Sequence, residues 1–226
     1  VKKIEGLENI KEIIMMTQEP IGKTARSNPA TYLKIYDEIR TLMSSTPEAK
    51  SFSLKPGDFS FNTPGGRCEE CKGEGRIVVE MQFLSDVEVL CDFCNGLKFK
   101  EEILKIRYNN KNISEILNMT ISEALLFFEG KNKIKRLLEI LESVGLGYLK
   151  LGQSSNTLSG GESQRIKIAK FLSSSNSSNV LFILDEPSVG LHVDDLKSLI
   201  NTFNNVIEKG NTILLIEHNT DLIKIS

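Results

Sequence analysis

The stretch Val180-Leu-Phe-Ile-Leu-Asp185-Glu186-Pro187 decides the fold class of this 226-residue chain. A continuous apolar run that ends in two carboxylates is typical of a parallel strand buried on both faces. Apolar residues at helical spacing follow over residues 196–207, and a second apolar run occupies residues 212–216. Strand, helix and strand in this order predict a right-handed crossover unit of an α/β fold.

Asp185 and Glu186 stand where ligands bind in such folds, at the carboxyl end of a parallel strand. In phosphoryl transfer, an Asp at this position can hold Mg²⁺ while a neighbouring Glu polarises the attacking water. Taken alone, the two residues fit the beginning of a solvated loop equally well. Other motifs must therefore decide between a nucleotide site and a loop.

Two glycines precede a helical segment in the string Leu158-Ser159-Gly160-Gly161-Glu162-Ser-Gln164-Arg165. Backbone N–H groups at the positive end of a helix form a cradle for phosphate. The string resembles the signature motif of ABC ATPases. The order of motifs extends this resemblance, because Asp185-Glu186 and then a strand ending in Glu217-His218 follow the signature. The resemblance favours a nucleotide site over a loop.

The resemblance also implies roles for individual residues. Glu186, His218 and Gln18 would be catalytic. His218 would be the switch histidine that contacts the γ-phosphate, and Gln18 would reach Mg²⁺ or the attacking water. The residues implied to bind ATP with its Mg²⁺ are Ser159, Gly160, Gly161, Glu162, Gln164 and Asp185. In this family two nucleotide-binding halves enclose ATP, so the signature residues of one half act on nucleotide that the other half holds.

The string Ile21-Gly22-Lys23-Thr24 copies the end of a phosphate-binding loop. The full pattern G-x-x-x-x-G-K-[ST] requires Gly where Thr17 stands, so we reject the string as a Walker A motif. A Walker A motif would then lie upstream of Val1. We expect ATPase activity of the full-length protein, whereas we expect the isolated chain to be inactive.

The four cysteines form two pairs, Cys68-Glu-Glu-Cys71 and Cys91-Asp-Phe-Cys94. Two such pairs at this separation can close a tetrahedral Zn²⁺ site. Two disulfides, or reduced core cysteines, are the alternatives; disulfides are disfavoured in the cytosol, and core cysteines seldom share this spacing. Residues 77–84 and 103–108, which bracket the second pair, have strand-like composition and predict a small sheet.

The charge of the chain gives no general attraction to nucleic acid. Twenty-eight Lys and Arg residues stand against 30 Asp and Glu residues, for a net charge of −2. Basic residues that could still contact phosphates are Lys55, Arg67, Arg76, Lys98 and Lys100. Solvated surface charge is the simpler interpretation for each of them. No apolar run suits a membrane span or a signal peptide, so we expect a cytoplasmic protein without a membrane partner.

The cysteine pairs lie between the predicted Q-loop and the signature, and this placement resembles the excinuclease A-subunit family of ABC ATPases. Further strings carry the resemblance: Pro20-Ile-Gly-Lys-Thr-Ala-Arg-Ser-Asn-Pro-Ala-Thr-Tyr32, Pro56-Gly-Asp-Phe-Ser-Phe-Asn62, Gly65-Gly-Arg-Cys68, Val144-Gly-Leu-Gly-Tyr148 and Glu217-His-Asn219. It implies an α/β fold with a partial P-loop NTPase (ABC-type) ATP-binding lobe, a signature or helical lobe and an inserted zinc-binding module. The expected boundaries are 1–25 and 173–226 for the ATP-binding lobe and 26–172 for the signature domain, with the zinc module at about 50–111.

The resemblance further implies that the chain is the second, C-terminal ABC half of a protein that recognises DNA damage with ATP in nucleotide excision repair. Such a protein would load a UvrB-type subunit on damaged DNA. The implied cofactors are ATP, Mg²⁺ and Zn²⁺, and the implied partners are damaged double-stranded DNA, a UvrB-type subunit, the other ABC half and a homodimer partner. A diverged paralogue linked to drug resistance stays open, because Ser163, Ser188-Val189 and the serine-rich linker 173–179 depart from the family pattern. A transporter's soluble ATPase subunit would have no reason to carry the cysteine pairs, and a zinc-dependent chaperone or scaffold would need neither Glu186 nor His218.

Overall fold

The structure, a computed structural model, describes residues 6–22, 24, 26–79, 81, 87–174, 178–191 and 193–224. The chain forms two compact units. Unit 1 comprises Val1–Lys23, Ile121–Leu149 and Ser155–Ser226, and unit 2 comprises Thr24–Thr120 and Lys150–Ser154. The expected boundaries divide the chain by function, into an ATP-binding lobe and a signature domain, whereas the two units are divided by compactness. The expected boundaries therefore stay a prediction.

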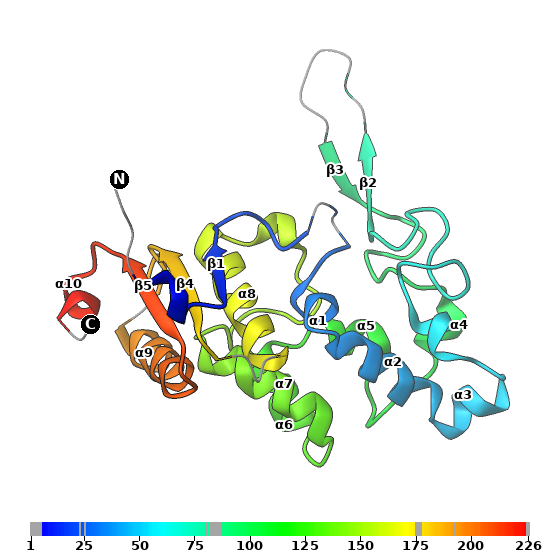
Figure 1. Ribbon diagram of the computed structural model, residues 1–226. Coiled ribbons are helices and arrows are strands. Elements are labelled where there is room, and N and C mark those ends of the chain that lie inside the picture. Colours follow the sequence, from blue (N-terminus) through cyan, green and yellow to red (C-terminus); the bar gives the residue numbers. More distant parts are fainter. Residues whose placement is uncertain are drawn as a thin grey trace. The chain divides into compact units, whose positions relative to one another are not determined.

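Unit 1 contains a three-stranded parallel sheet in the order β1-β4-β5 (Figure 1). Its strands are β1 (Glu12–Met16), β4 (Val180–Asp185) and β5 (Thr212–Ile216). Met16 pairs with Leu184, and Asp185 pairs with Ile216, so the carboxyl ends of all three strands meet at one edge. The strands predicted at residues 180–184 and 212–216 are confirmed.

One face of this sheet is covered by helices. Phe182 of β4 packs edge-on against Phe171, with ring centroids 4.4 Å apart, and Val180 and Leu184 are buried on the same face. The other elements of unit 1 are η1 (Leu7–Asn9), α6 (Ile121–Phe127), α7 (Asn132–Ser143), η3 (Ser155–Thr157), α8 (Gly160–Ser174), α9 (Val193–Glu208) and α10 (Thr220–Ile223). Among the described residues, no helix combines the length and apolar character that a bilayer crossing requires.

Unit 2 is built from short helices and one hairpin. Its helical elements are α1 (Pro29–Tyr32), α2 (Ile35–Ser44), α3 (Pro47–Ser51), η2 (Pro56–Phe59), α4 (Glu101–Leu104) and α5 (Ile113–Leu117). The hairpin consists of β2 (Arg76–Val79) and β3 (Val87–Leu90), which pair antiparallel. The ring of Tyr36 stacks on buried Phe61 at 4.8 Å, so aromatic packing supports the centre of this unit.

The strand predicted at residues 103–108 is wrong, because the chain enters α4 there. Lys100 is extended, Glu101 and Glu102 occupy the positive end of the helix, and Ile103 and Ile106 bury their side chains at a helical spacing of three. The strand that pairs with β2 is β3, which precedes Cys91. Residues 80 and 82–84 of the other predicted strand lie outside the described residues, as do Lys23 and residues 175–177 of the serine-rich linker.

Candidate active site and metal centre

Asp185 and Glu186 lie at the carboxyl edge of the sheet in unit 1. Asp185 is the last residue of β4, and Glu186 adopts a left-handed backbone with φ 47°, which is uncommon for a residue other than Gly. The Glu186 N–H donates to the Ile216 carbonyl at 2.8 Å, so the neighbouring strand holds this conformation. Backbone strain held by surrounding hydrogen bonds recurs at active sites.

His218 follows β5 and meets Glu186 at this edge. Its Nε2 lies 3.3 Å from Glu186 Oε1, and the two side chains are 85% and 39% exposed. The pair is therefore accessible to a ligand. The structure brings together two of the three residues that the sequence proposed as catalytic.

Gln18 follows β1 and reaches the same edge. Its Nε2 donates to the Asp185 carbonyl at 3.2 Å. Gly160 lies against this amide: a Cβ at Gly160 would stand 2.7 Å from Gln18 Oε1, so any larger residue there would displace Gln18. Gln18, the two carboxylates and the beginning of α8 therefore form one site.

Ser159 and Glu162 close the beginning of α8 with a reciprocal capping box. The Ser159 N–H donates to Glu162 Oε2 at 2.7 Å, and the Glu162 N–H donates to Ser159 Oγ at 3.2 Å. Gly161 comes close to the turn that follows Glu186, because a Cβ at Gly161 would stand 2.7 Å from the Val189 carbonyl. The positive end of this 15-residue helix suits an anion such as phosphate.

The side chain of Gln164 supports the carboxylate edge from within the core of unit 1. Its side chain is fully buried, and its Nε2 donates to the carbonyls of Met16 at 2.6 Å and Asp185 at 3.1 Å. These bonds tie α8 to the ends of β1 and β4. The sequence placed Gln164 among the nucleotide-binding residues, and the structure shows which backbone groups its amide binds.

Arg165, also fully buried, holds the turn after the carboxylates. Its Nη1 donates to the carbonyls of Pro187 at 3.3 Å and Val189 at 3.2 Å. A buried guanidinium needs such partners, because an unpaired charge away from water is costly. Our reading of the sequence gave Arg165 no role beyond its place in the signature string.

Glu217 joins the same turn to the end of β5, and sequence reasoning missed it. Its Oε1 accepts the Ser188 N–H at 2.9 Å, and its Oε2 accepts the N–H groups of His218 at 2.9 Å and Asn219 at 3.1 Å. Burial acts to raise the pKa of this carboxyl, but the hydrogen bonds outweigh burial and lower the pKa. A carboxylate that binds backbone N–H groups leaves no spacing pattern in a sequence.

The four cysteines converge in unit 2. Their sulfur atoms lie within 4.8 Å of one another; Cys68 and Cys91 Sγ are 3.9 Å apart, and Cys71 and Cys94 Sγ are 3.7 Å apart. Disulfide sulfurs stand about 2.05 Å apart, whereas the edges of a tetrahedral zinc site with 2.3 Å bonds measure about 3.8 Å. All four cysteines are buried, and this donor set fits a metal ion such as Zn²⁺.

Burial affects the pKa values of the thiols. Burial raises the pKa of Cys94 to about 12 and also raises the pKa of Cys71. A bound cation would therefore be needed to keep these two thiols ionised near neutral pH. In Cys91 burial acts in the same direction, but hydrogen bonds from the backbone of Cys94 and Phe93 outweigh it and lower the pKa.

The two cysteine pairs share one backbone course. Three left-handed residues follow each pair at the same spacing. After the first pair they are Lys72, Gly73 and Gly75, with φ of 50°, 84° and 78°. After the second pair they are Asn95, Gly96 and Lys98, with φ of 49°, 78° and 73°. The Gly75 N–H donates to Cys71 Sγ at 3.2 Å, a bond that stabilises a thiolate. Lys98 therefore adopts, after the second pair, the left-handed conformation that Gly75 adopts after the first pair.

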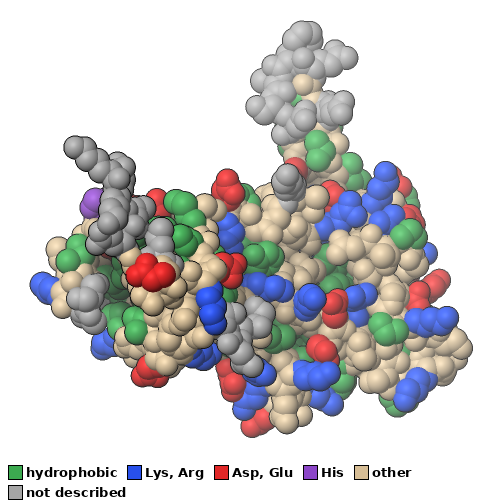
Figure 2. All heavy atoms as spheres, in the orientation of Figure 1, with side chains coloured by type: hydrophobic (Ala, Val, Ile, Leu, Met, Phe, Trp, Pro, Cys, Tyr) green, Lys and Arg blue, Asp and Glu red, His purple; other side chains and the backbone are tan. Residues whose placement is uncertain are grey.

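The basic residues considered for DNA contact lie among acidic ones. Arg67 binds Glu69 at 3.1 Å, and Arg76 approaches Glu88 at 3.5 Å. Figure 2 shows basic and acidic side chains interspersed on the face drawn. A DNA phosphate would have to compete with these carboxylates, and DNA contact at the basic residues stays a prediction.

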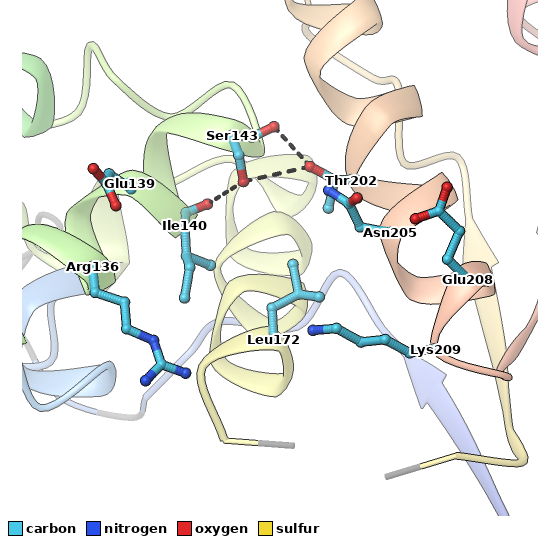
Figure 3. A pocket seen from close by; sticks show the side chains of 9 residues that line it. All are labelled: Arg136, Glu139, Ile140, Ser143, Leu172, Thr202, Asn205, Glu208 and Lys209. Atoms are coloured by element: carbon cyan, nitrogen blue, oxygen red, sulfur yellow. Dashed lines mark hydrogen bonds between the residues drawn. The ribbon is translucent and has the colours of Figure 1, made fainter. Parts of the chain in front are cut away.

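A groove of about 630 Å³ lies between α7, α8 and α9 of unit 1 (Figure 3). Its walls include the charged residues Arg136 and Lys209, and the Thr202 hydroxyl donates to the Ser143 carbonyl at 2.9 Å beside them. None of the residues predicted to bind ATP or zinc lines this groove. The groove is therefore separate from the carboxylate edge.

The chain is similar to proteins of known name over almost its whole length. It is 56% identical to UvrABC system protein A of Aquifex aeolicus, covering 99% of this chain and 24% of the relative. It is 53% identical to UvrABC system protein A of Methanothermobacter thermautotrophicus, covering 98% of this chain and 23% of the relative. The chain thus spans about a quarter of the length of these relatives.

The crystal structure of UvrA2 from Deinococcus radiodurans superposes with a TM-score of 0.88 at 43% identity, covering 96% of this chain and 27% of that one. The predicted ABC-type α/β fold is confirmed by this similarity. The sequence model of the family described as ABC transporter matches residues 70–189, a segment that contains the signature string and both carboxylates. Because the match covers more than half of the chain, the chain belongs to the ABC transporter family, and it resembles the UvrABC system A proteins.

Proposed function

We propose that this chain forms one nucleotide-binding half of an ATPase that recognises DNA damage in nucleotide excision repair, as its resemblance to excinuclease A subunits implies. The observation that carries the proposal is the meeting of Gln18, Asp185, Glu186 and His218 at one strand edge. The positive end of α8 lies beside them. The carboxylates, the amide and the imidazole each suit one part of ATP hydrolysis.

In this mechanism the Glu186 carboxylate orients a water molecule and accepts its proton, while the His218 imidazole, 3.3 Å from Glu186, contacts the γ-phosphate. Asp185 and Gln18 would hold Mg²⁺. The Gln18 Nε2 is engaged by the Asp185 carbonyl, which leaves the amide oxygen as the ligand. When bound, Mg²⁺ offsets the negative charge that develops on the phosphate oxygens.

The signature residues act on nucleotide held by the other ABC half. Ser159 Oγ accepts the Glu162 N–H, which leaves its own proton available for a phosphate oxygen. Gly160 and Gly161 have no side chains, so they leave the backbone at the beginning of α8 accessible to a phosphate. This chain has no Walker A motif of its own, so we expect it to hydrolyse little ATP unless it is joined to one.

The cysteine cluster would hold one Zn²⁺ through Cys68, Cys71, Cys91 and Cys94. Four thiolates without an open position are typical of a structural zinc site, so a bound ion would hold the base of the β2–β3 hairpin together. Damaged double-stranded DNA, a UvrB-type subunit, the other ABC half and a homodimer partner complete the assembly. Its compartment would be the cytoplasm.

The test is Glu186→Gln in a full-length protein that carries this chain. We expect ATP turnover to fall by about a hundredfold or more, because a general base contributes on the order of 10² to 10⁴ to the rate. Affinity for ATP and zinc content should stay close to the parent values. Steady-state phosphate release, ATP binding and metal analysis provide the three measurements.

Glu208→Gln serves as the matched control, since it removes a carboxylate at the end of α9, away from the edge. It should leave turnover unchanged. Parental turnover in Glu186→Gln would contradict the ATPase mechanism.

Ser163 and Ser188-Val189 depart from the family pattern, and these departures keep a diverged paralogue as the second candidate. Both candidates hydrolyse ATP, and they differ in the loading of a UvrB-type subunit on damaged DNA. Gel-shift assays with damaged and undamaged duplexes, with and without that subunit, separate them. Damage-dependent loading supports the repair subunit, and ATP turnover without loading supports the paralogue.

A further inference from the structure

Tyr148 lies beside the signature loop, and the nucleotide mechanism above gives it no role. Gly145 follows α7 with φ 73°, and Leu146 and Leu149, on either side of Tyr148, are buried. The Leu149 N–H donates to the Leu146 carbonyl at 3.0 Å. This turn therefore fixes the backbone of Tyr148, while its side chain remains 53% exposed.

The Tyr148 hydroxyl completes a chain of hydrogen bonds that ends at the signature serine. It donates to Glu162 Oε1 at 2.6 Å, while Glu162 Oε2 accepts the Ser159 N–H at 2.7 Å. Both oxygens of the carboxylate are thus engaged, one by each neighbour. The Glu162 N–H returns to Ser159 Oγ at 3.2 Å, so Tyr148, Glu162 and Ser159 form one connected group.

Glu162 presents an electrostatic problem at this position. A carboxylate one helical turn from Ser159 stands close to the place where the γ-phosphate would bind, and like charges a few ångströms apart repel strongly. A hydrogen bond from a neutral phenol draws the negative charge toward Tyr148 and fixes the rotamer of the carboxylate. Without that bond, Glu162 Oε1 could turn toward the phosphate.

The phenol is suited to remain a donor. Burial, followed by the hydrogen bond to Glu162, raises the pKa of Tyr148 to about 12, although Arg165 acts in the opposite direction. Tyr148 therefore keeps its proton throughout the physiological range. The bond to Glu162 does not depend on ordinary changes of pH.

We propose that Tyr148 is a positioning residue of the nucleotide site, which holds the Glu162 carboxylate away from the γ-phosphate and in place to support Ser159. This inference rests on the function proposed above. It assigns to Glu162 a supporting role in the signature loop, with Ser159 as the group that meets the phosphate.

The experiment compares Tyr148→Phe, Glu162→Gln and the double variant in the full-length protein. Tyr148→Phe removes one hydroxyl at a half-exposed position and keeps the ring, and we expect the KM for ATP to rise about threefold to tenfold, the range of one such hydrogen bond. The kcat should change by less than about twofold, since the loss weakens binding of the ground state and of the transition state equally.

Glu162→Gln is the decisive variant, because an amide keeps the shape of the side chain and removes its negative charge. Its oxygen can accept the Ser159 N–H, and its nitrogen can donate to the Tyr148 oxygen. We expect its KM to fall below that of the parent protein, because the negative charge near the γ-phosphate is removed. In this background Tyr148→Phe should change KM by less than about twofold, a rescue that a general loss of structure would not show.

Three results would overturn the proposal: an unchanged KM in Tyr148→Phe, an equal rise of KM in both backgrounds, or a higher KM in Glu162→Gln alone. Glu186→Gln is measured in the same series. If Glu186→Gln keeps its turnover, the proposed function itself fails; if it loses turnover and the KM pattern is absent, only the role of Tyr148 fails.

Discussion

The carboxylate edge of unit 1 and the cysteine cluster of unit 2 are held in place by different forces. At the edge, buried side chains of the sheet position the backbone, and Gln164, Arg165 and Glu217 add hydrogen bonds to the strand ends and the turn. Around the cluster, the β2–β3 hairpin exposes most of its side chains, and Ile77 is the partly buried apolar residue that packs against the cysteines.

This difference predicts two kinds of response to substitution. Several independent hydrogen bonds hold the carboxylate edge, so the loss of one should lower the free energy of unfolding by a limited amount. The cluster has little apolar support, so the loss of one sulfur should remove the metal and the local fold together. The following predictions test this contrast, from the largest expected effect to the smallest.

Cys91→Ser should abolish stoichiometric zinc and the ordered backbone around the cluster. Structural zinc contributes on the order of 10 kcal/mol to small domains that depend on it. Metal analysis and amide hydrogen exchange over residues 66–99 measure the two losses. Phe93→Ser is the control, because Phe93 lies in the same pair and is 79% exposed; it should keep its zinc. A full equivalent of zinc in Cys91→Ser would contradict the contrast.

Gln164→Met should lower the free energy of unfolding of unit 1 by about 1 to 2 kcal/mol. The change leaves the carbonyls of Met16 and Asp185 without the Gln164 donor, but it also removes an Oε1 that has no partner among the described residues. Urea unfolding measures the loss. Asn204→Leu, at an exposed amide on α9, should change stability by less than about 0.5 kcal/mol. Equal losses in both variants would mean that the edge lacks the support described.

Glu217→Gln should cost about 1 kcal/mol at neutral pH, because an amide cannot accept all three backbone N–H groups. The folded-state pKa of Glu217 lies below the ordinary value of 4.5, so its contribution is present above that pH and is lost as the pH falls through the folded pKa. Unfolding measured from neutral pH downward should show a constant difference between the two proteins above the ordinary value of 4.5 and a shrinking difference as the pH falls below it, through the folded pKa. A difference that stays constant with pH would contradict the role of the carboxylate charge.

Lys98 offers the smallest expected effect and a test within the cluster itself. Its ammonium lies 5.3 Å from the Phe61 ring centroid. Burial lowers the pKa of Lys98, although the Cys71 sulfur acts in the opposite direction. Lys98→Met should weaken zinc binding about threefold to tenfold through the loss of a nearby positive charge. Lys98→Gly should recover part of this, since Gly relieves the left-handed backbone by up to about 1 kcal/mol.

Chelator competition measures zinc affinity in both Lys98 variants. Lys72→Met is the control, because Lys72 is also a left-handed lysine (φ 50°) that follows a cysteine pair, and its side chain is exposed. It should bind zinc as the parent does. Identical losses in Lys98→Met and Lys98→Gly would show that backbone strain at this position has no measurable effect.

The sequence predicted those features that have a local pattern. The buried strand before Asp185 and the paired spacing of the cysteines each follow from a few neighbouring residues, and the structure brings Glu186 to His218 and closes the four sulfurs into one cluster. The strand expected at residues 103–108 failed because Ile103 and Ile106 fit a helix as well as a strand, and the two glutamates at the helix start decided between them.

The supporting residues of the site could not be predicted. Arg165, Glu217 and Tyr148 act on groups that are distant in sequence or belong to the backbone, and no spacing rule connects a side chain with a carbonyl in another element. Their contribution depends on tertiary contacts. Sequence patterns therefore located the chemistry, while the structure was needed to find what holds it in place.

The cysteine cluster also has a consequence for how such a protein can evolve. Both ends of the segment between Cys71 and Cys91 are anchored at the same four sulfur atoms, and Figure 1 shows the β2–β3 hairpin projecting from this base. The entropy cost of closing a loop grows only with the logarithm of its length. Insertions and deletions in this segment should therefore be tolerated, so selection could change its reach and its surface chemistry without altering the rest of unit 2.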